Sequence, residues 1–381
     1  MSIALEILTY VFILILVSYV LLIGIYSVSW YKIKSWKSEA KVPITKVTIV
    51  LPVRNESENI NLCLKNLSCQ NYPEDLFEII IVDDSSSDNT VNLIKHFIKN
   101  SNENRISLIE HIGNNNFGKK QAITEAIKNA KGELIITTDA DCIMNQKWIA
   151  SIVEYYEVYK PPMIVAPVKF YNEKGLFQNL QSFEFLSLIA SGAASVQLGL
   201  PIMCNGANLA YEKKVFIKVN GFESSVNHVS GDDVFLMHKI KKVTKRKILF
   251  IKCKEAIVET KAQNSLHDFI NQRKRWVSKS MAYTDLATIL SALIVFILNL
   301  FLIASFILAF FISEFKFVFM IIFTSKIIID FPILYGISSF TGNLKNMFLF
   351  LPLQFIYPFY IFVITVVGLF GKFEWKKRKD N

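Results

Sequence analysis

The chain has 381 residues, of which 52% are hydrophobic, and a formal net charge of +10 at pH 7. It is too apolar for an ordinary soluble protein, and its middle is too charged for a bundle made only of membrane helices. Its five cysteines are scattered and lack metal-site spacing, which argues against a disulfide framework or a zinc site. The apolar residues gather at the two ends, so we expect membrane segments that flank one large domain.

The N-terminal stretch predicts a transmembrane anchor over residues 1–31. Residues 3–29 are almost unbroken in apolarity, and this length spans a bilayer. The stretch has no basic start and no evident cleavage site of small residues, so an anchor fits better than a cleaved signal peptide. Four lysines follow at once, and the positive-inside rule then places the middle domain in the cytosol. These lysines are Lys32, Lys34, Lys37 and Lys41.

Residues 45–283 predict one α/β domain in which strands and helices alternate. Four apolar runs predict buried strands, and a helix is expected after each of the first three. The strands are expected at 46–52, 77–82, 105–110 and 134–137, and the helices end near Leu67, Lys99 and Gly132. Asn55 with Glu58 has the pattern of an N-cap and its partner, which predicts the start of the first helix. The alternation predicts a mostly parallel sheet with helices on both faces.

Polar residues directly follow three of these strands. In open α/β sheets the ligand lies beyond the carboxyl ends of the strands, so these residues should gather on one edge. They are Arg54, Asn55 and Glu56 after the first strand, Asp83 and Asp84 after the second, and Asp139 and Asp141 after the fourth. Asp139 and Asp141 repel each other unless a cation lies between them, and the small Ala140 leaves room for a divalent metal. A lone Asp-x-Asp is also a common polar turn, but three polar clusters on one edge favour a ligand site.

The second half of the domain begins with three predicted elements. Residues 164–168 predict another strand. Residues 176–200 predict a helix whose apolar run is interrupted by three polar side chains. We interpret this pattern as a helix on the side of the domain that would contact an acceptor substrate. These side chains are Gln178, Gln181 and Glu184. Residues 205–208 predict a tight turn before an apolar strand at 209–211.

Two further helices carry candidate functional residues. Asp232 and Asp233 begin one of them, where the helix dipole favours negative charge. Residues 266–280 predict an amphipathic helix. Gln272, Arg275 and Trp276 share one face of it because they are spaced i, i+3 and i+4. The same helix could lie on a membrane surface, and both interpretations can hold together.

Residues 284–371 predict a C-terminal membrane region, followed by a basic tail at 372–381. Candidate spans are 286–312, 317–337 and 347–370. The middle span carries Lys326 and Asp330, which are four residues apart and can neutralise each other on one helix face. Three spans would place the tail outside the cell, whereas its basic residues favour the cytosol. The alternative is that one of the three spans lies in the interface or re-enters the membrane.

At this point the motifs resemble a family. The chain resembles membrane-anchored family 2 glycosyltransferases with the GT-A fold, the group that includes cellulose, hyaluronan and poly-N-acetylglucosamine synthases and ceramide glucosyltransferases. The resemblance covers about residues 46–280 and the flanking membrane layout. It is carried by 50–56, 82–85, Gly118 and Lys119, 139–141, 206–208, Asp232 and Asp233, and 272–276. The family commonly has Glu-Asp where this chain has Asp232-Asp233.

The resemblance implies inverting transfer of a sugar from a nucleotide-diphosphate sugar, with Mg²⁺ or Mn²⁺ as the cofactor. It implies that Asp139 and Asp141 hold the metal, which stabilises the diphosphate leaving group. Nucleotide-binding roles are implied for Pro52, Arg54, Glu56, Asp84, Lys119 and Asp139. Asp233 is the expected general base, while Asp232, Gln272, Arg275 and Trp276 are expected to contact the diphosphate or the acceptor. For Lys119, an alternative is a helix-start lysine that simply lies in water.

The function that we expect is therefore sugar transfer to a lipid-linked or polysaccharide acceptor at the cytosolic membrane face. About four spans make a poor pore, so single transfer competes with processive synthesis assisted by partner membrane subunits. A membrane protein that only senses nucleotide sugars would lack the base and the Arg-Trp helix. A nucleic-acid binder would interleave basic and aromatic residues on one exposed face, whereas here the basic residues lie close to the membrane segments.

Overall fold

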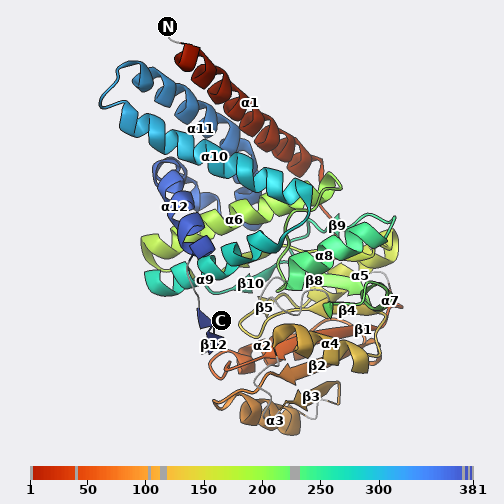
Figure 1. Cartoon of the computed structure of the whole chain (residues 1–381). Helices are drawn as coiled ribbons and strands as arrows, with labels where there is room; N and C mark the ends of the chain where they lie inside the picture. Colours follow the sequence, from red (N-terminus) through yellow and green to blue (C-terminus); the bar gives the residue numbers. More distant parts are fainter. Residues whose placement is uncertain are drawn as a thin grey trace.

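The structure, a computed structural model, describes residues 3–38, 42–101, 104–111, 118–223, 232–370, 374–375 and 378–379. In these ranges, apolar helices lie at one end of the molecule and a seven-stranded sheet at the other (Figure 1). Helices α6 (Gly175–Gln197) and α9 (Leu266–Ser278) lie between them. The two regions therefore meet along these two helices.

The main sheet has the strand order β3-β2-β1-β4-β8-β6-β9. Its strands are β1 (Val47–Val53), β2 (Phe77–Asp83), β3 (Ile106–Glu110), β4 (Leu134–Thr137), β6 (Met163–Val165), β8 (Leu209–Glu212) and β9 (Leu249–Phe250). Strands β3, β2, β1 and β4 run parallel, whereas β8 is antiparallel to β4 and β6. The expected mostly parallel sheet is confirmed, and the carboxyl ends of four neighbouring strands share one edge.

Helices cover both faces of the sheet, which explains why β1 is apolar throughout. Val50 packs in a hydrophobic cluster with α4, α6 and α8, whereas Ile49 and Leu51 pack in a second cluster with α2, α3 and α5. Strands that are buried on both faces read as continuous apolar runs. The remaining helices of the domain are α2 (Ile60–Ser68), α3 (Thr90–Ser101), α4 (Lys119–Asn129), α5 (Trp148–Tyr159), α7 (Lys213–Lys218) and α8 (Asp232–Val243), with the 3₁₀ helices η1 (Glu74–Leu76) and η3 (Lys279–Ala282).

The prediction that Asn55 caps the first helix is wrong. Helix α2 begins at Ile60, and Asn55 instead has a left-handed backbone with a φ of 50°. Its side-chain Oδ1 accepts a hydrogen bond from the Ser87 amide at 2.8 Å, and its own amide donates to Ser86 Oγ at 2.9 Å. Asn55 therefore joins the loops that follow β1 and β2, which braces the sheet edge where the candidate ligand residues lie.

The single strand that we expected at 164–168 is two strands. Pro167 has no amide proton to continue a ladder, and the chain changes sheets at this point. Strand β6 stays in the main sheet, and β7 (Val168–Phe170) joins a small sheet with β5 (Ile143–Met144) and β10 (Val258–Thr260). The small sheet brings β10 beside the segment that follows β4, because β5 pairs with β10.

Four helices in the described part of the chain are long and apolar enough to cross a membrane. They are α1 (Ile3–Lys32), α10 (Leu286–Leu308), α11 (Glu314–Thr341) and α12 (Phe350–Phe370), the last preceded by the 3₁₀ helix η4 (Leu344–Leu349). Helix α10 is shorter than its predicted span, and α11 is longer. Beyond them, β11 (Glu374–Trp375) pairs with β12 (Arg378–Lys379), while the other tail residues lie outside the described ones.

The ion pair expected on the middle C-terminal span is confirmed and is part of a larger buried cluster. Lys326 Nζ lies 2.6 Å from Asp330 Oδ2 and donates to Gln354 Oε1 at 2.5 Å. The Tyr19 hydroxyl donates to Asp330 Oδ1 at 2.7 Å. The cluster thus joins α1, α11 and α12, which matters because an unpaired charge in hydrocarbon is costly.

The bundle and the domain share one hydrophobic core. Trp30, at the end of α1, is fully buried, and its ring contacts Phe250 of β9 and Phe340 of α11. Gly336 of α11 allows this approach, because a Cβ atom there would lie 2.4 Å from Trp30 Nε1. The domain is therefore packed directly onto the long apolar helices.

Replacing Gly132 with alanine is expected to destabilise the domain by about 1 to 3 kcal/mol, the usual cost of overpacking. A Cβ atom at this position would lie 2.4 Å from the backbone nitrogen of Thr48 and 2.5 Å from the carbonyl carbon of Val47, so β1 would have to move. The midpoint of thermal unfolding in detergent measures the effect. Gly24→Ala is the control, because among the described residues its Cβ would meet only Ile329 Cδ1, at 3.5 Å. Equal midpoints for the two variants would contradict the prediction.

Candidate active site

One pocket at the carboxyl edge of the parallel strands collects the predicted site residues. The space between its walls, about 1190 Å³ including the part open to solvent, is large enough for a ligand of nucleotide size. The predicted residues that line it are Pro52, Arg54, Glu56, Asp84, Lys119, Asp139, Asp141, Asp233, Gln272, Arg275 and Trp276. Asp232 begins α8, but its side chain lies outside the described residues. The expectation that polar residues after separate strands meet on one edge is therefore met.

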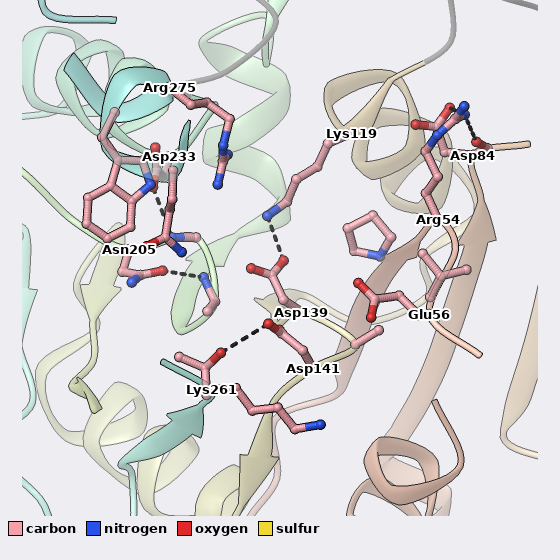
Figure 2. Close-up of a pocket in the computed structure, with 18 of the residues that line it drawn as sticks. Arg54, Glu56, Asp84, Lys119, Asp139, Asp141, Asn205, Asp233, Lys261 and Arg275 are labelled. Atoms are coloured by element: carbon pink, nitrogen blue, oxygen red, sulfur yellow. Dashed lines mark hydrogen bonds and ion pairs between the residues drawn. The ribbon is translucent and has the colours of Figure 1, made fainter. Parts of the chain in front are cut away.

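The loops after β1 and β2 form one side of the pocket (Figure 2). Asp84 is buried, and the Arg54 guanidinium donates to its backbone carbonyl at 2.5 Å and lies 3.9 Å from its carboxylate.

Asp88, in the loop after β2, connects the two loops. Burial alone would raise the pKa of Asp88, but hydrogen bonds from Thr90 and Ser57 lower it to about 2. Asp88 therefore stays ionised at neutral pH and holds both loops in place.

Asp139 and Asp141 lie in the middle of the pocket, at the end of β4 (Figure 2). Lys119, the first residue of α4, has its Nζ 2.6 Å from Asp139 Oδ1. Its side chain therefore faces the pocket and does not simply extend into bulk water. The Thr260 hydroxyl of β10 donates to Asp141 Oδ2 at 3.1 Å. Each carboxylate thus has its own polar partner, a cation for Asp139 and a neutral hydroxyl for Asp141.

Two buried thiols flank these acids. Burial raises the pKa of the Cys63 and Cys142 thiols, and the charges of Asp141 and Asp139 add to the shift. Both thiols therefore stay protonated at neutral pH, and the carboxylates supply the negative charge at this edge.

Asp233 lies on the opposite side of the pocket from Arg54 and Asp84 (Figure 2). Its Oδ2 accepts a hydrogen bond from the Gly206 amide at 3.0 Å, and its Oδ1 accepts one from the Val234 amide at 2.8 Å. These charge-assisted hydrogen bonds orient the carboxylate. The position of Asp233 therefore depends on the turn that contains Gly206.

Asn208 holds that turn, residues 205–208, in place through side-chain hydrogen bonds to other parts of the domain. The Asn208 side chain is completely buried and uses all of its hydrogen-bonding groups nearby. Its Nδ2 donates to the carbonyls of Pro167 and Ala256 at 2.8 Å each, and its Oδ1 accepts from Trp148 Nε1 at 3.0 Å. The predicted turn before β8 is thus confirmed, and it serves as a rigid support for Asp233.

Helix α9 closes the pocket above the acids. Ser265 caps the helix by accepting a hydrogen bond from the Asp268 amide at 3.1 Å. Gln272, Arg275 and Trp276 all line the pocket, as their shared helix face predicts. The helix ends at Ser278, two residues before the predicted end, and continues as η3.

The part of the chain that contains most of the pocket residues matches a known protein family. Residues 134–369, more than half of the chain, match glycosyl transferase family group 2. The chain belongs to glycosyl transferase family group 2. Residues 48–219 also match glycosyl transferase family 2. The resemblance carried by the sequence motifs is thereby confirmed.

Curated relatives of this glycosyltransferase match it over part of their length. A dolichyl N-acetyl-α-D-glucosaminyl phosphate 3-β-D-2,3-diacetamido-2,3-dideoxy-β-D-glucuronosyltransferase of Methanococcus voltae is 34% identical over 116 residues, which are 30% of this chain and 35% of the relative. A poly-β-1,6-N-acetyl-D-glucosamine synthase of Staphylococcus epidermidis is 28% identical over 179 residues, 46% of this chain and 41% of the relative. The matched segments thus cover less than half of these relatives.

A solved structure covers nearly the whole glycosyltransferase chain. The mannosyltransferase PcManGT from Pyrobaculum calidifontis, in complex with GDP-Man and Mn²⁺, aligns with a TM-score of 0.60 and 17% identity. The alignment covers 96% of this chain and 99% of that one. The shared architecture confirms the predicted GT-A fold.

The acidic residues of the glycosyltransferase pocket fit a divalent cation. Mg²⁺ is usually bound by one or two carboxylates together with substrate phosphates and water, and Asp139 and Asp141 provide two such carboxylates. Within the described ranges, no three His, Cys, Asp or Glu side chains come together to form a complete metal site. Among the described residues, Asp139 and Asp141 therefore form part of a coordination shell, which the oxygens of a diphosphate could complete.

Sequence reasoning missed several lining residues of the glycosyltransferase pocket. They are Phe170, Phe185, Thr260, Lys261 and Lys279. Phe170 and Phe185 stack at 4.6 Å between ring centroids, and Phe185 lies 6.0 Å from the Trp276 ring. Thr260 was missed because β10 has only three residues. The polar interruptions of the helix at 176–200 were the available signal for the region around Phe185.

Proposed function

We propose that this glycosyltransferase moves a sugar from a nucleotide-diphosphate sugar to a lipid-linked or polysaccharide acceptor and inverts the anomeric centre. The observation that carries the proposal is the arrangement of acids in one pocket. Asp139 and Asp141 lie beside the loops that we assign to the nucleotide, and Asp233 lies across the pocket from those loops (Figure 2). An acid pair for the leaving group and a separate base for the acceptor are what a single displacement needs.

The donor would bind along the strand edge. We assign the nucleobase to Asp84, the nucleotide pocket to Pro52, Arg54, Glu56 and Lys119, and the diphosphate to Gln272 and Arg275. Mg²⁺ or Mn²⁺, held by Asp139 and Asp141, would act as a Lewis acid that stabilises the diphosphate leaving group. The cations Lys119 and Arg275, both lining residues, support this assignment because they face the same region.

Asp233 would accept the proton of the acceptor hydroxyl as that oxygen attacks the anomeric carbon. Its two backbone hydrogen bonds hold the carboxylate in place, so one oxygen lone pair can point to the hydroxyl. Direct attack inverts the centre, so an α-linked donor gives a β-linked product. Asp232, next to it at the start of α8, is assigned to the acceptor.

The aromatic side chains at the acceptor end support a sugar or lipid-linked sugar as the acceptor. Trp276, Phe185 and Phe170 form a continuous aromatic wall of the pocket. Helix α9, which carries Trp276, packs against the membrane helix α12. An acceptor anchored in the bilayer could therefore reach the pocket beside α12. The names of the two relatives, one a dolichyl phosphate glycosyltransferase and the other a polysaccharide synthase, are consistent with either acceptor.

Incubating membranes with a panel of nucleotide sugars and measuring nucleotide release tests the proposed function. Release that requires an acceptor extract supports transfer, and Asp233→Asn is the inactive control. The size of the product separates single transfer, which adds one sugar, from processive synthesis with a partner pore, which gives a polymer. Binding of a nucleotide sugar without any release would instead support a non-catalytic sensor and overturn the proposal.

We propose that the domain, residues 45–283, lies on the cytosolic side, between an anchor at 1–31 and the membrane region at 284–371. Lys32, Lys34 and Lys37 follow α1 directly, and Lys41 lies outside the described residues. Protease added to inside-out vesicles is expected to cut the domain, whereas intact cells should protect it. The reverse pattern would contradict the topology and remove the domain from its supply of nucleotide sugar.

A further inference from the structure

A buried arginine lies directly behind the pocket-lining face of α9. Arg273 does not line the pocket, and only 2% of its surface is exposed. Its guanidinium contacts two groups that do line it. Nη1 donates to Gln272 Oε1 at 2.7 Å, and the guanidinium carbon lies 4.1 Å from the centre of the Trp276 ring. The placement of both pocket side chains therefore depends on where this guanidinium is held.

Two residues from other helices hold the guanidinium. Glu184 of α6 forms an ion pair with it, with Oε2 at 2.5 Å from Nη2. Tyr360 of α12 accepts a hydrogen bond from Nε at 3.1 Å, and its hydroxyl donates to Glu184 Oε1 at 3.1 Å. The three side chains form a closed ring of hydrogen bonds. Glu184 is also buried, with 6% exposure, so the ion pair between Glu184 and Arg273 is shielded from solvent.

Close packing of α12 against α9 supports the ring of hydrogen bonds formed by Arg273, Glu184 and Tyr360. Helix α12 approaches α9 so closely that a Cβ atom at Gly368 would lie 2.6 Å from Val277 Cβ. The Tyr360 ring also stacks on Phe269 of α9, with 5.8 Å between centroids. Phe269 in turn lies under the Arg273 guanidinium at 4.6 Å. A membrane helix is thus joined by specific contacts to the helix that lines the pocket.

We propose that Glu184 and Tyr360 are positioning residues that act through Arg273 to hold Gln272 and Trp276 in the pocket, so that the membrane helix α12 completes the active site. The inference rests on the proposed function, because it assigns Gln272 and Trp276 to the diphosphate and the acceptor. Neither Glu184 nor Tyr360 lines the pocket. Their influence on transfer must therefore pass through the geometry of α9.

The first test is a set of conservative substitutions in the full-length enzyme. Tyr360→Phe removes one hydroxyl and is expected to lower kcat/KM about fivefold to tenfold. Glu184→Gln removes the charge that orients Arg273 and is expected to lower it by about 10²-fold, since displacements of about 1 Å can cost that much. Tyr357→Phe is the matched control: it makes the same change one turn earlier on α12, at a residue that lies outside the ring of hydrogen bonds. Equal losses for Tyr360→Phe and Tyr357→Phe would overturn the inference.

A double-mutant cycle separates positioning from general stability. If Tyr360 acts through the pocket side chains, Tyr360→Phe should cost little once Gln272 and Trp276 have both been replaced by alanine. Independent effects would instead multiply, and a fully multiplicative result would overturn the inference. Tyr360→Phe keeps the test valid even if Glu184→Gln fails to fold, because it leaves the buried ion pair intact.

A spectroscopic measurement needs no activity at all. The emission of Trp276 is obtained as the difference between each enzyme and its Trp276→Phe counterpart. Glu184→Gln and Tyr360→Phe should shift this emission to the red, because the indole loses its stacked guanidinium and gains water. An unchanged emission would overturn the inference. If no nucleotide sugar is turned over, the proposed function fails, and this emission alone decides whether the ring positions Trp276.

Discussion

Replacing Asp233 with asparagine is expected to lower the rate of sugar transfer by about 10²- to 10⁴-fold, the usual effect of removing a general base. The asparagine keeps one oxygen, which can accept the Gly206 amide hydrogen bond and hold the turn in place, while the hydrogen bond from the Val234 amide is lost. The change that acts on the rate is the loss of the ability to take a proton. Donor binding, measured by titration with a fluorescent nucleotide analogue, should therefore stay within about twofold of the wild type while turnover collapses.

Asp232→Asn is the control for this prediction, because it makes the same change at the neighbouring position. It should have a milder effect if Asp232 shapes the helix start or touches the acceptor. An active Asp233 variant beside an inactive Asp232 variant would move the base by one residue. Full activity in both variants would remove the central step of the proposed mechanism.

Replacing Asp141 with asparagine, or removing divalent cations with a chelator, is expected to lower turnover by about 10²- to 10³-fold. A Lewis acid at the diphosphate contributes several kcal/mol to the transition state, and each 1.36 kcal/mol is a factor of ten in rate. Added Mg²⁺ or Mn²⁺ should restore the chelated wild type but not the variant. The fold should survive, because the asparagine oxygen can still accept the Thr260 hydroxyl.

Glu110→Gln is a matched control for the metal prediction. Glu110 also lies at the carboxyl end of a parallel strand, and it pairs with a lysine as the neighbouring Asp139 does, since Lys95 Nζ lies 2.8 Å from its carboxylate. It does not line the pocket. A loss of activity as large as that of Asp141→Asn would mean that strand-end acids matter for folding rather than for metal binding. Full turnover in both the chelated enzyme and the Asp141 variant would exclude the metal role.

Sequence reasoning predicted the strand edge well because the signals there are local. Strand β4 is uniformly apolar up to Thr137, and the acids follow within four residues, so the end of the strand and the position of the acids are read from one short segment. The parallel order then brings the other strand-end clusters to the same edge. The Asn55 prediction failed for the converse reason. Its side chain bonds to Ser87 of a loop 32 residues away, and no local pattern reveals that partner.

The ring behind α9 could not be predicted for the same physical reason. Glu184 and Arg273 are 89 residues apart, and Glu184 and Tyr360 are 176 apart. The sequence shows only a polar residue in an apolar helix and a tyrosine in a membrane span. Their pairing depends on how α6, α9 and α12 pack together, which is a tertiary property. The buried position of Arg273, between the pocket-lining residues Gln272 and Arg275, is visible only once these helices are in place.

The polar cluster in the membrane bundle also sets an order of events during synthesis. Tyr19 and Asp330 are 311 residues apart, so the first helix enters the bilayer long before its partner exists. At about 5 to 20 residues per second, the delay is about 15 to 60 s. Until then α1 can diffuse in the lipid without its hydrogen-bond partner, and a chain interrupted before α11 cannot form the cluster. Docking of the anchor therefore marks the moment at which α11 has been synthesised and has met α1.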